Sequence, residues 1–196
     1  SATSNFGRGK AFGIHEFFDQ IGAILGPILV GLILFLKKDY NLSFAFLFLP
    51  ALICLLILFF CFKNYPVSLI LKQEKDILLL KEKKLSLNFW LYSLFTLLSV
   101  AGFLNFPLIA YHLKSNKIAP DSFIAFLFAL AMGIDALVAL IVGRVYDQKG
   151  LKTLLILPFL NILLVFFGFS FNFKFIILAI LLWGIIMGIQ ETIMRA

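Results

Sequence analysis

The sequence predicts an all-α, polytopic membrane protein with six transmembrane helices. Hydrophobic residues make up 62% of its 196 residues and charged residues only 14%, whereas soluble domains contain about 45–50% and about 25% respectively. The mean hydropathy is +1.06. A soluble domain of this length exposes too much surface to bury so many apolar side chains. A soluble enzyme, a disordered regulator and a secreted disulfide-rich module are therefore excluded.

Six apolar runs account for the six helices. Each run has close to the 20 residues that a helix needs to cross about 30 Å of hydrocarbon. The first run carries polar residues in its opening turns, and only a few residues separate the last two, which predicts a tight helical hairpin. The predicted spans are residues 12–36, 43–62, 89–113, 123–145, 153–171 and 175–194.

Lysine and arginine residues are distributed unequally between the two sides of the membrane. Six spans place both ends of the chain on one side, and 12 of the 17 basic residues fall on that side. Because cytoplasmic loops carry an excess of basic residues, both ends are predicted to lie in the cytoplasm, at the inner membrane of a bacterium. The same placement accounts for the net charge of +7, so no nucleic-acid partner is expected.

The longest gap between apolar runs covers residues 63–88. Leu71, Leu78 and Leu85 recur every seventh residue there, and lysines occupy many of the other positions. This pattern predicts a basic amphipathic helix on the anionic cytoplasmic leaflet, with an irregular tether as the alternative. The gap is also the only candidate boundary between two membrane bundles. It divides the chain into residues 1–63, a loop over 64–88, and residues 89–196.

Ionisable side chains within the spans are the candidate functional groups. An unpaired charge in hydrocarbon costs about 3 kcal/mol or more, so such residues face a bundle interior or a water-filled cavity. Asp135 lies in the fourth span, and Glu191 lies near the inner end of the last. Glu16 and Asp19 are three residues apart and share one face of the first helix. We predict a proton- or cation-coupling role for these residues; the alternative is that polar neighbours cap them and they only hold helices together.

One further candidate is Asn105, which precedes Pro107 in the third span. This pair predicts a kinked or locally unwound helix, a common way to line a substrate cavity. No catalytic residues, cofactor or metal site are expected. The segment "HEFFD" begins like a zinc-protease helix, but Asp19 stands where the second histidine would be required. The chain also opens without an initiator Met and stops at the end of a span, which suggests a piece of a longer protein.

Two stretches carry a resemblance to a known family. The segment "GRVYDQKGLK" between the fourth and fifth spans resembles the cytoplasmic loop motif of major facilitator superfamily transporters, Gly-x-x-x-Asp-Arg-x-Gly-Arg-Lys/Arg. In the first span, "GAILGPILVG" resembles the superfamily's fifth-helix motif, Gly-x-x-x-Gly-Pro-x-x-Gly-Gly. The matching residues are Gly143, Asp147, Gly150 and Lys152 in the loop and Gly22, Gly26, Pro27 and Gly31 in the helix, while Gln148, Leu151 and Val30 depart from the patterns.

The resemblance aligns the six spans with helices five to ten of a twelve-helix permease. Residues 1–63 then supply the last two helices of the N-terminal bundle, and residues 89–196 supply the first four of the C-terminal bundle. It implies a secondary transporter that works by alternating access, with proton-coupled antiport of a small solute. Its partners would be the lipid bilayer, the solute, protons and the remaining helices. A non-transporting membrane anchor or assembly subunit is the alternative.

The resemblance also gives expectations for individual residues. By the superfamily's pseudo-two-fold symmetry, Asp147 is expected to latch onto the start of the first span, around residues 11–13, with Arg195 as a supporting cation. Independently of the family, Gly22 with Gly26, and Gly184 with Gly188, are pairs of small residues spaced to let helix backbones approach closely.

Overall fold

The computed structural model describes residues 8–64 and 86–194, and all regular structure within them is helical. The predicted amphipathic helix between the two bundles falls almost wholly outside the described residues, as does Arg195. The helices are α1 (Arg8–Lys37), α2 (Tyr40–Asn64), α4 (Leu87–Ala101), α5 (Phe106–Ser115), α6 (Asp121–Lys149), the 3-10 helix η1 (Gly150–Ile156), α7 (Leu157–Gly168) and α8 (Phe173–Met194).

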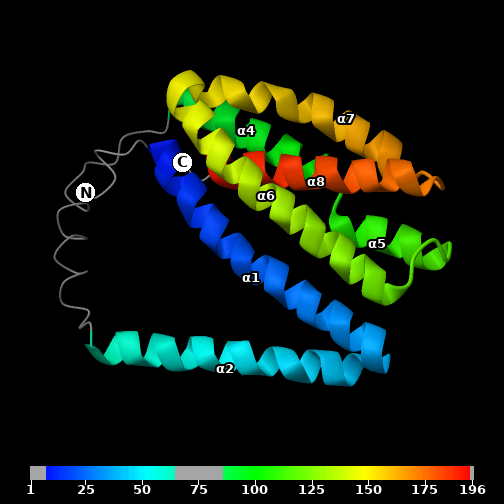
Figure 1. Ribbon diagram of the computed structural model, residues 1–196. Helices are drawn as coiled ribbons and strands as arrows, with labels where there is room; N and C mark the ends of the chain where they lie inside the picture. Colours follow the sequence, from blue (N-terminus) through cyan, green and yellow to red (C-terminus); the bar gives the residue numbers. More distant parts are fainter. Residues whose placement is uncertain (1–7, 65–85, 195–196) are drawn as a thin grey trace.

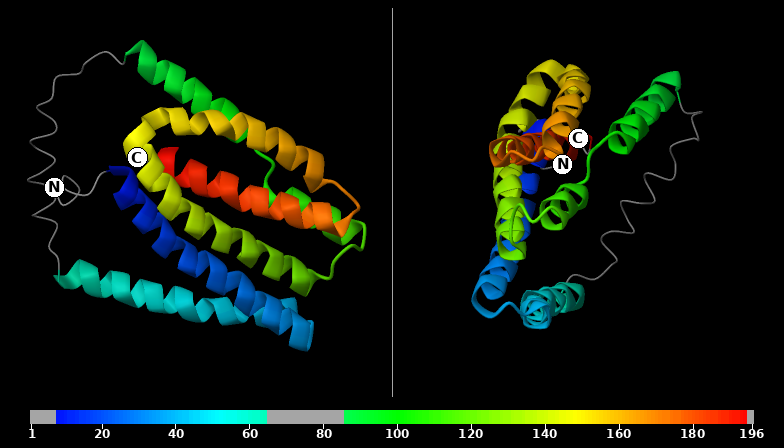
Figure 2. Two further views of the ribbon diagram at one scale, coloured as in Figure 1. Left: turned by 45° about the horizontal axis from the view of Figure 1, so that its top comes forward. Right: turned by 90° about the vertical axis from the view of Figure 1, so that its right-hand side faces the viewer.

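The six predicted spans correspond to these elements. Within the described residues, five helical stretches are long and apolar enough to cross a membrane. One of them, Asp121–Gly168, is 48 residues long and reverses direction between α6 and α7 (Figures 1 and 2), so it contains two of the predicted spans. Gly150 lies at this reversal with a φ of 61°, a conformation that side chains with a Cβ rarely adopt. The fold class predicted from the sequence is confirmed.

The third span is interrupted, as its sequence predicts. α4 ends at Ala101 and α5 begins at Phe106, with non-helical residues between them. Pro107 occupies the first turn of α5, where its missing N–H would have no acceptor in any case. The indole Nε1 of Trp183 in α8 donates a 2.9 Å hydrogen bond to the carbonyl oxygen of Leu104 in the break. A backbone group that leaves the helical pattern inside a bundle thus finds a partner on another helix.

α6 is the central element of the arrangement. α1 lies alongside it over much of its length, α8 packs on its other side, and α7 lies beside α8 (Figures 1 and 2). α2 contacts α1 and otherwise stands at the edge of the bundle (Figure 1). The most apolar window of α2 has no buried residue, which suits a surface covered by lipid or by further helices.

Glycines allow the central helices to approach closely at particular points. A Cβ atom built at Gly143 of α6 would lie 2.3 Å from the carbonyl oxygen of Gly9 in α1. At Gly184 of α8 it would lie 2.4 Å from the carbonyl oxygen of Ala131. The predicted close approach at Gly184 and Gly188 is therefore present.

The other predicted glycine pair, Gly22 and Gly26, makes no such contact among the described residues. Among the described residues, no atom lies within 4 Å of a Cβ built at Gly22 or Gly26. Within the described residues, α1 approaches α6 most closely through Gly9 and Gly13 instead, and a close contact at Gly22 and Gly26 stays a prediction. Gly31 does pack closely, against the ring of Phe126.

Candidate functional site

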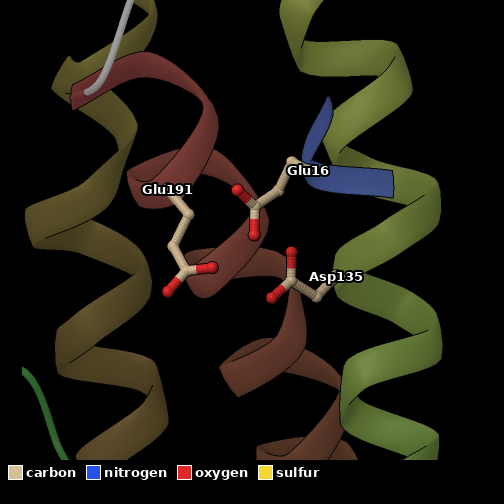
Figure 3. Close-up of side chains that lie close together, drawn as sticks. All are labelled: Glu16, Asp135 and Glu191. Atoms are coloured by element: carbon tan, nitrogen blue, oxygen red, sulfur yellow. The ribbon is translucent and has the colours of Figure 1, made fainter. Parts of the chain in front are cut away.

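Three of the predicted coupling residues meet inside the bundle, although each comes from a different helix. One carboxylate oxygen from each of Glu16 (α1), Asp135 (α6) and Glu191 (α8) lies within 4.8 Å of the other two. Their side chains point toward one another (Figure 3). Glu16 is 2% exposed and Asp135 is fully buried, while Glu191 is half-buried. We call these three residues the carboxylate cluster.

The side chain of Gln20 joins the carboxylate cluster together. Its Nε2 atom donates to Glu16 Oε1 at 2.8 Å, to Asp135 Oδ2 at 3.0 Å and to Glu191 Oε2 at 3.2 Å. A carboxamide nitrogen carries two hydrogens, so three acceptors compete for two donors. The sequence places Gln20 beside the acidic residues of α1, but its contact with two other helices was not predicted. The four-residue spacing from Glu16 is the only signal for it.

The spacing of the cluster determines its chemistry. Two full negative charges 4.8 Å apart repel each other by about 3 kcal/mol at an effective dielectric constant of 20. Carboxylates placed this closely can share a proton or bind a cation. Carboxylate oxygens are also ligands for hard metal ions, so the geometry permits cation binding where the sequence predicted no metal site.

Two other predicted residues lie outside the carboxylate cluster. Asp19 is exposed and pairs with His15, whose Nδ1 lies 3.2 Å from Asp19 Oδ2. It nevertheless lines a cavity of about 290 Å³ together with Glu16, Gln20 and Glu191. Asn105 lies in the break between α4 and α5 and is exposed.

A larger cavity of about 890 Å³ adjoins the carboxylate cluster. Asn105 lines it, as expected, and Gln190 and Glu191 add an amide and a carboxylate side chain. Its wall includes an aromatic group in which neighbouring ring centroids are 4.7–5.9 Å apart. This group consists of Phe103, Phe106, Phe128 and Trp183. Glu191 lines both cavities, so it connects the carboxylate cluster to the larger space.

The loop-motif residues lie where α6 ends beside the start of α1. Asp147 Oδ1 accepts a hydrogen bond from the backbone N–H of Gly9 at 2.8 Å, and Oδ2 accepts one from Lys10 at 2.9 Å. The first N–H groups of a helix have no acceptor within the helix and carry a partial positive charge, so a carboxylate is favourable there. The contact falls just before the expected residues 11–13. Lys152 is exposed.

A second polar contact ties the opposite ends of the helices together, and the sequence did not predict it. The Nζ of Lys114 in α5 lies 3.1 Å from Asp121 Oδ2 in α6 and 3.3 Å from the hydroxyl oxygen of Tyr40 in α2. The Tyr40 hydroxyl also donates a short hydrogen bond to Asp121. Polar residues at helix ends are so common that this sequence pattern alone gives no signal for the contact.

Comparison with known proteins gives a family match and uncharacterised relatives. A family model described as "Major Facilitator Superfamily" matches residues 2–196. Uncharacterised proteins of Mycobacterium bovis and Mycobacterium tuberculosis are each 35% identical over 202 residues, covering 99% of this chain and 49% of the relative. The chain thus spans about half the length of the curated relatives it matches. No solved structure gives a significant match.

Proposed function

Because this chain belongs to the Major Facilitator Superfamily, we propose that it is part of a secondary active transporter that exchanges a small solute for protons by alternating access. Membership confirms the resemblance carried by the two sequence motifs. It also confirms that the chain is an integral membrane protein rather than an enzyme, because the superfamily consists of transporters.

The proposal places the described helices within a twelve-helix protein. α1 and α2 would be the last two helices of an N-terminal bundle, and α4 to α8 would form the first four spans of a C-terminal bundle. The coverage of 49% of the relatives supports this assignment. The excess of basic residues in the loops on one side supports a cytoplasmic position for the start of α1 and the end of α6, in a bacterial cell membrane.

The observation that carries the proposal is the position of the carboxylate cluster between the two bundles. Glu16 belongs to the proposed N-terminal bundle, whereas Asp135 and Glu191 belong to the C-terminal one. Uptake of a proton weakens the repulsion between these side chains and favours contact of α1 with α6 and α8. Loss of a proton strengthens the repulsion and favours separation. Protonation is thereby coupled to the relative position of the bundles, which is the requirement for proton-driven alternating access.

The test removes one titratable carboxylate without changing its shape. Full-length protein is reconstituted into vesicles that contain a pH-sensitive dye and carry a proton gradient, and a panel of small solutes is added. A transported solute dissipates the gradient with wild-type protein. The Asp135→Asn variant is expected to bind and exchange that solute without moving protons. Gradient dissipation by Asp135→Asn at the wild-type rate would instead assign the cluster to helix packing.

A matched control is available at the opposite end of the helices. Asp39 is exposed, and its Oδ1 accepts a hydrogen bond from the backbone N–H of Leu42 at 3.2 Å. Asn at this position keeps an acceptor oxygen and removes one negative charge. Asp39→Asn is therefore expected to leave proton exchange unchanged, which separates a specific effect at Asp135 from a general effect of charge.

A further inference from the structure

The three residues Tyr40, Lys114 and Asp121 form a closed ring of contacts between three helices. Tyr40 is the first residue of α2, Lys114 lies in the last turn of α5, and Asp121 is the first residue of α6. Lys114 donates to both other residues, and the Tyr40 hydroxyl donates to Asp121. The Lys114 Nζ also lies 5.4 Å from the centroid of the Tyr40 ring, within the range of a cation–π contact.

The ring of contacts lies at the end of a cavity that leads toward the larger one. All three side chains line a cavity of about 490 Å³ between α1, α2, α5 and α6. Phe106 and Phe128 line both this cavity and the one of about 890 Å³. The two cavities are therefore adjacent, and a route from the side of Tyr40 to the larger cavity begins at these three residues.

The contact is at the far end of α6 from the Asp147 contact. α6 spans 29 residues from Asp121 to Lys149, so the two contacts are separated by about 39 Å along the helix axis. In the orientation proposed above, Asp147 is cytoplasmic and Asp121 faces the outside. Each contact joins a helix of the proposed N-terminal bundle to α6 of the C-terminal bundle.

We propose that Tyr40, Lys114 and Asp121 form an external gate, which closes the route from outside to the larger cavity when the Tyr40 hydroxyl binds Asp121. This inference rests on the proposed function, because a gate requires a transported solute. Lys114 and Asp121 both belong to the C-terminal bundle and are separated by only seven residues, so their ion pair persists when the bundles part. Tyr40 alone belongs to the other bundle. Its hydroxyl and ring are the contacts that break when the gate opens.

The test measures access through the gate and needs neither a known solute nor a proton gradient. The full-length protein, freed of its native cysteines, carries Ala110→Cys, at a residue that lines both cavities. A membrane-impermeant maleimide is added to the outside of intact cells, and the rate at which it labels the introduced cysteine is measured. Tyr40→Phe removes the hydroxyl and keeps the ring, so it is expected to raise the labelling rate about tenfold or more, since a hydrogen bond to a charged group is lost.

A matched control and a second variant complete the experiment. Tyr146 lies at the end of α6 far from Asp121 and lines neither cavity, and Tyr146→Phe is expected to label at the wild-type rate. Lys114→Gln removes the cation over the Tyr40 ring and serves if Tyr40→Phe fails to reach the membrane; it should also raise labelling. Correctly inserted variants that label no faster than wild type would overturn the gate. That result would leave the coupling role of Asp135 untouched, and failure of Asp135→Asn to alter proton exchange would leave the gate untouched.

Discussion

Replacement of Gly143 by alanine tests the close contact between α1 and α6. The added Cβ would lie 2.3 Å from the carbonyl oxygen of Gly9 and 3.0 Å from its carbonyl carbon. Ordinary contacts begin near 3.4 Å, so the two backbones must separate by about 1 Å. The obstacle is backbone on the neighbouring helix, which cannot rotate away as a side chain does. Overpacking of this kind costs about 1–3 kcal/mol.

The higher helix propensity of alanine offsets part of this cost. Alanine in a helix is more favourable than glycine by about 0.5–1 kcal/mol. Separation of the helices also lengthens the 2.8 Å hydrogen bond from Gly9 to Asp147. We therefore expect Gly143→Ala to lower the free energy of unfolding by about 1–2 kcal/mol, which is about a five- to thirtyfold change in the folded-to-unfolded ratio.

Gly133 provides the control on the same helix. Among the described residues, no atom lies within 4 Å of a Cβ built there. Gly133→Ala therefore gains the helix propensity of alanine without a steric clash. Thermal unfolding of the full-length protein in detergent, followed by fluorescence-detected size exclusion, compares the two variants. Gly143→Ala should melt below wild type and Gly133→Ala at or above it. If both variants melt above wild type, the close contact between α1 and α6 is refuted.

Three further predictions follow from contacts described above. Asp147→Ala removes the acceptor of the first amides of α1, so these amides should exchange with deuterium about fivefold faster, corresponding to about 1 kcal/mol, whereas Asp147→Asn should keep part of the protection. Trp183→Phe leaves the carbonyl of Leu104 without its donor and should lower the free energy of unfolding by about 1–3 kcal/mol, which a thermal melt detects. Trp90→Phe, at an exposed position, should leave the free energy of unfolding unchanged. Residues 1–196 reconstituted alone should show no saturable solute flux, because the proposed pore needs the remaining helices; saturable flux would refute the twelve-helix assignment.

The spans were predictable because bilayer thickness imposes a length on each apolar run. The break in the third span was also readable, since Asn105 and Pro107 disfavour helix continuation locally. η1 was not predicted: the fifth span was expected to begin at residue 153, but the chain turns into a 3-10 helix directly at Gly150. A reversal this tight depends on packing of η1 against α6 and α8, which hydropathy does not encode.

The candidate site was predictable only in part. Buried charge is costly in a membrane, so Glu16, Asp135 and Glu191 could each be singled out individually. That they converge depends on which helix faces lie together, and a single sequence contains no signal for that. The same argument identified Asp19, which the structure places at an exposed position beside His15. Two carboxylates one helical turn apart lie on the same face, yet one can be buried while the other is exposed to solvent.

The glycine crossing of α1 and α6 has a mechanical consequence. It lies near one end of both helices, so it can serve as a fulcrum, with the rest of α6 as a lever arm. From Gly143 back to Asp121 this arm is about 33 Å long. A tilt of about 10° at the fulcrum displaces its far end by about 6 Å, twice the length of a hydrogen bond. Tight packing at one end thus converts a small rotation into a full separation at the other, while Asp147 stays bound to the start of α1.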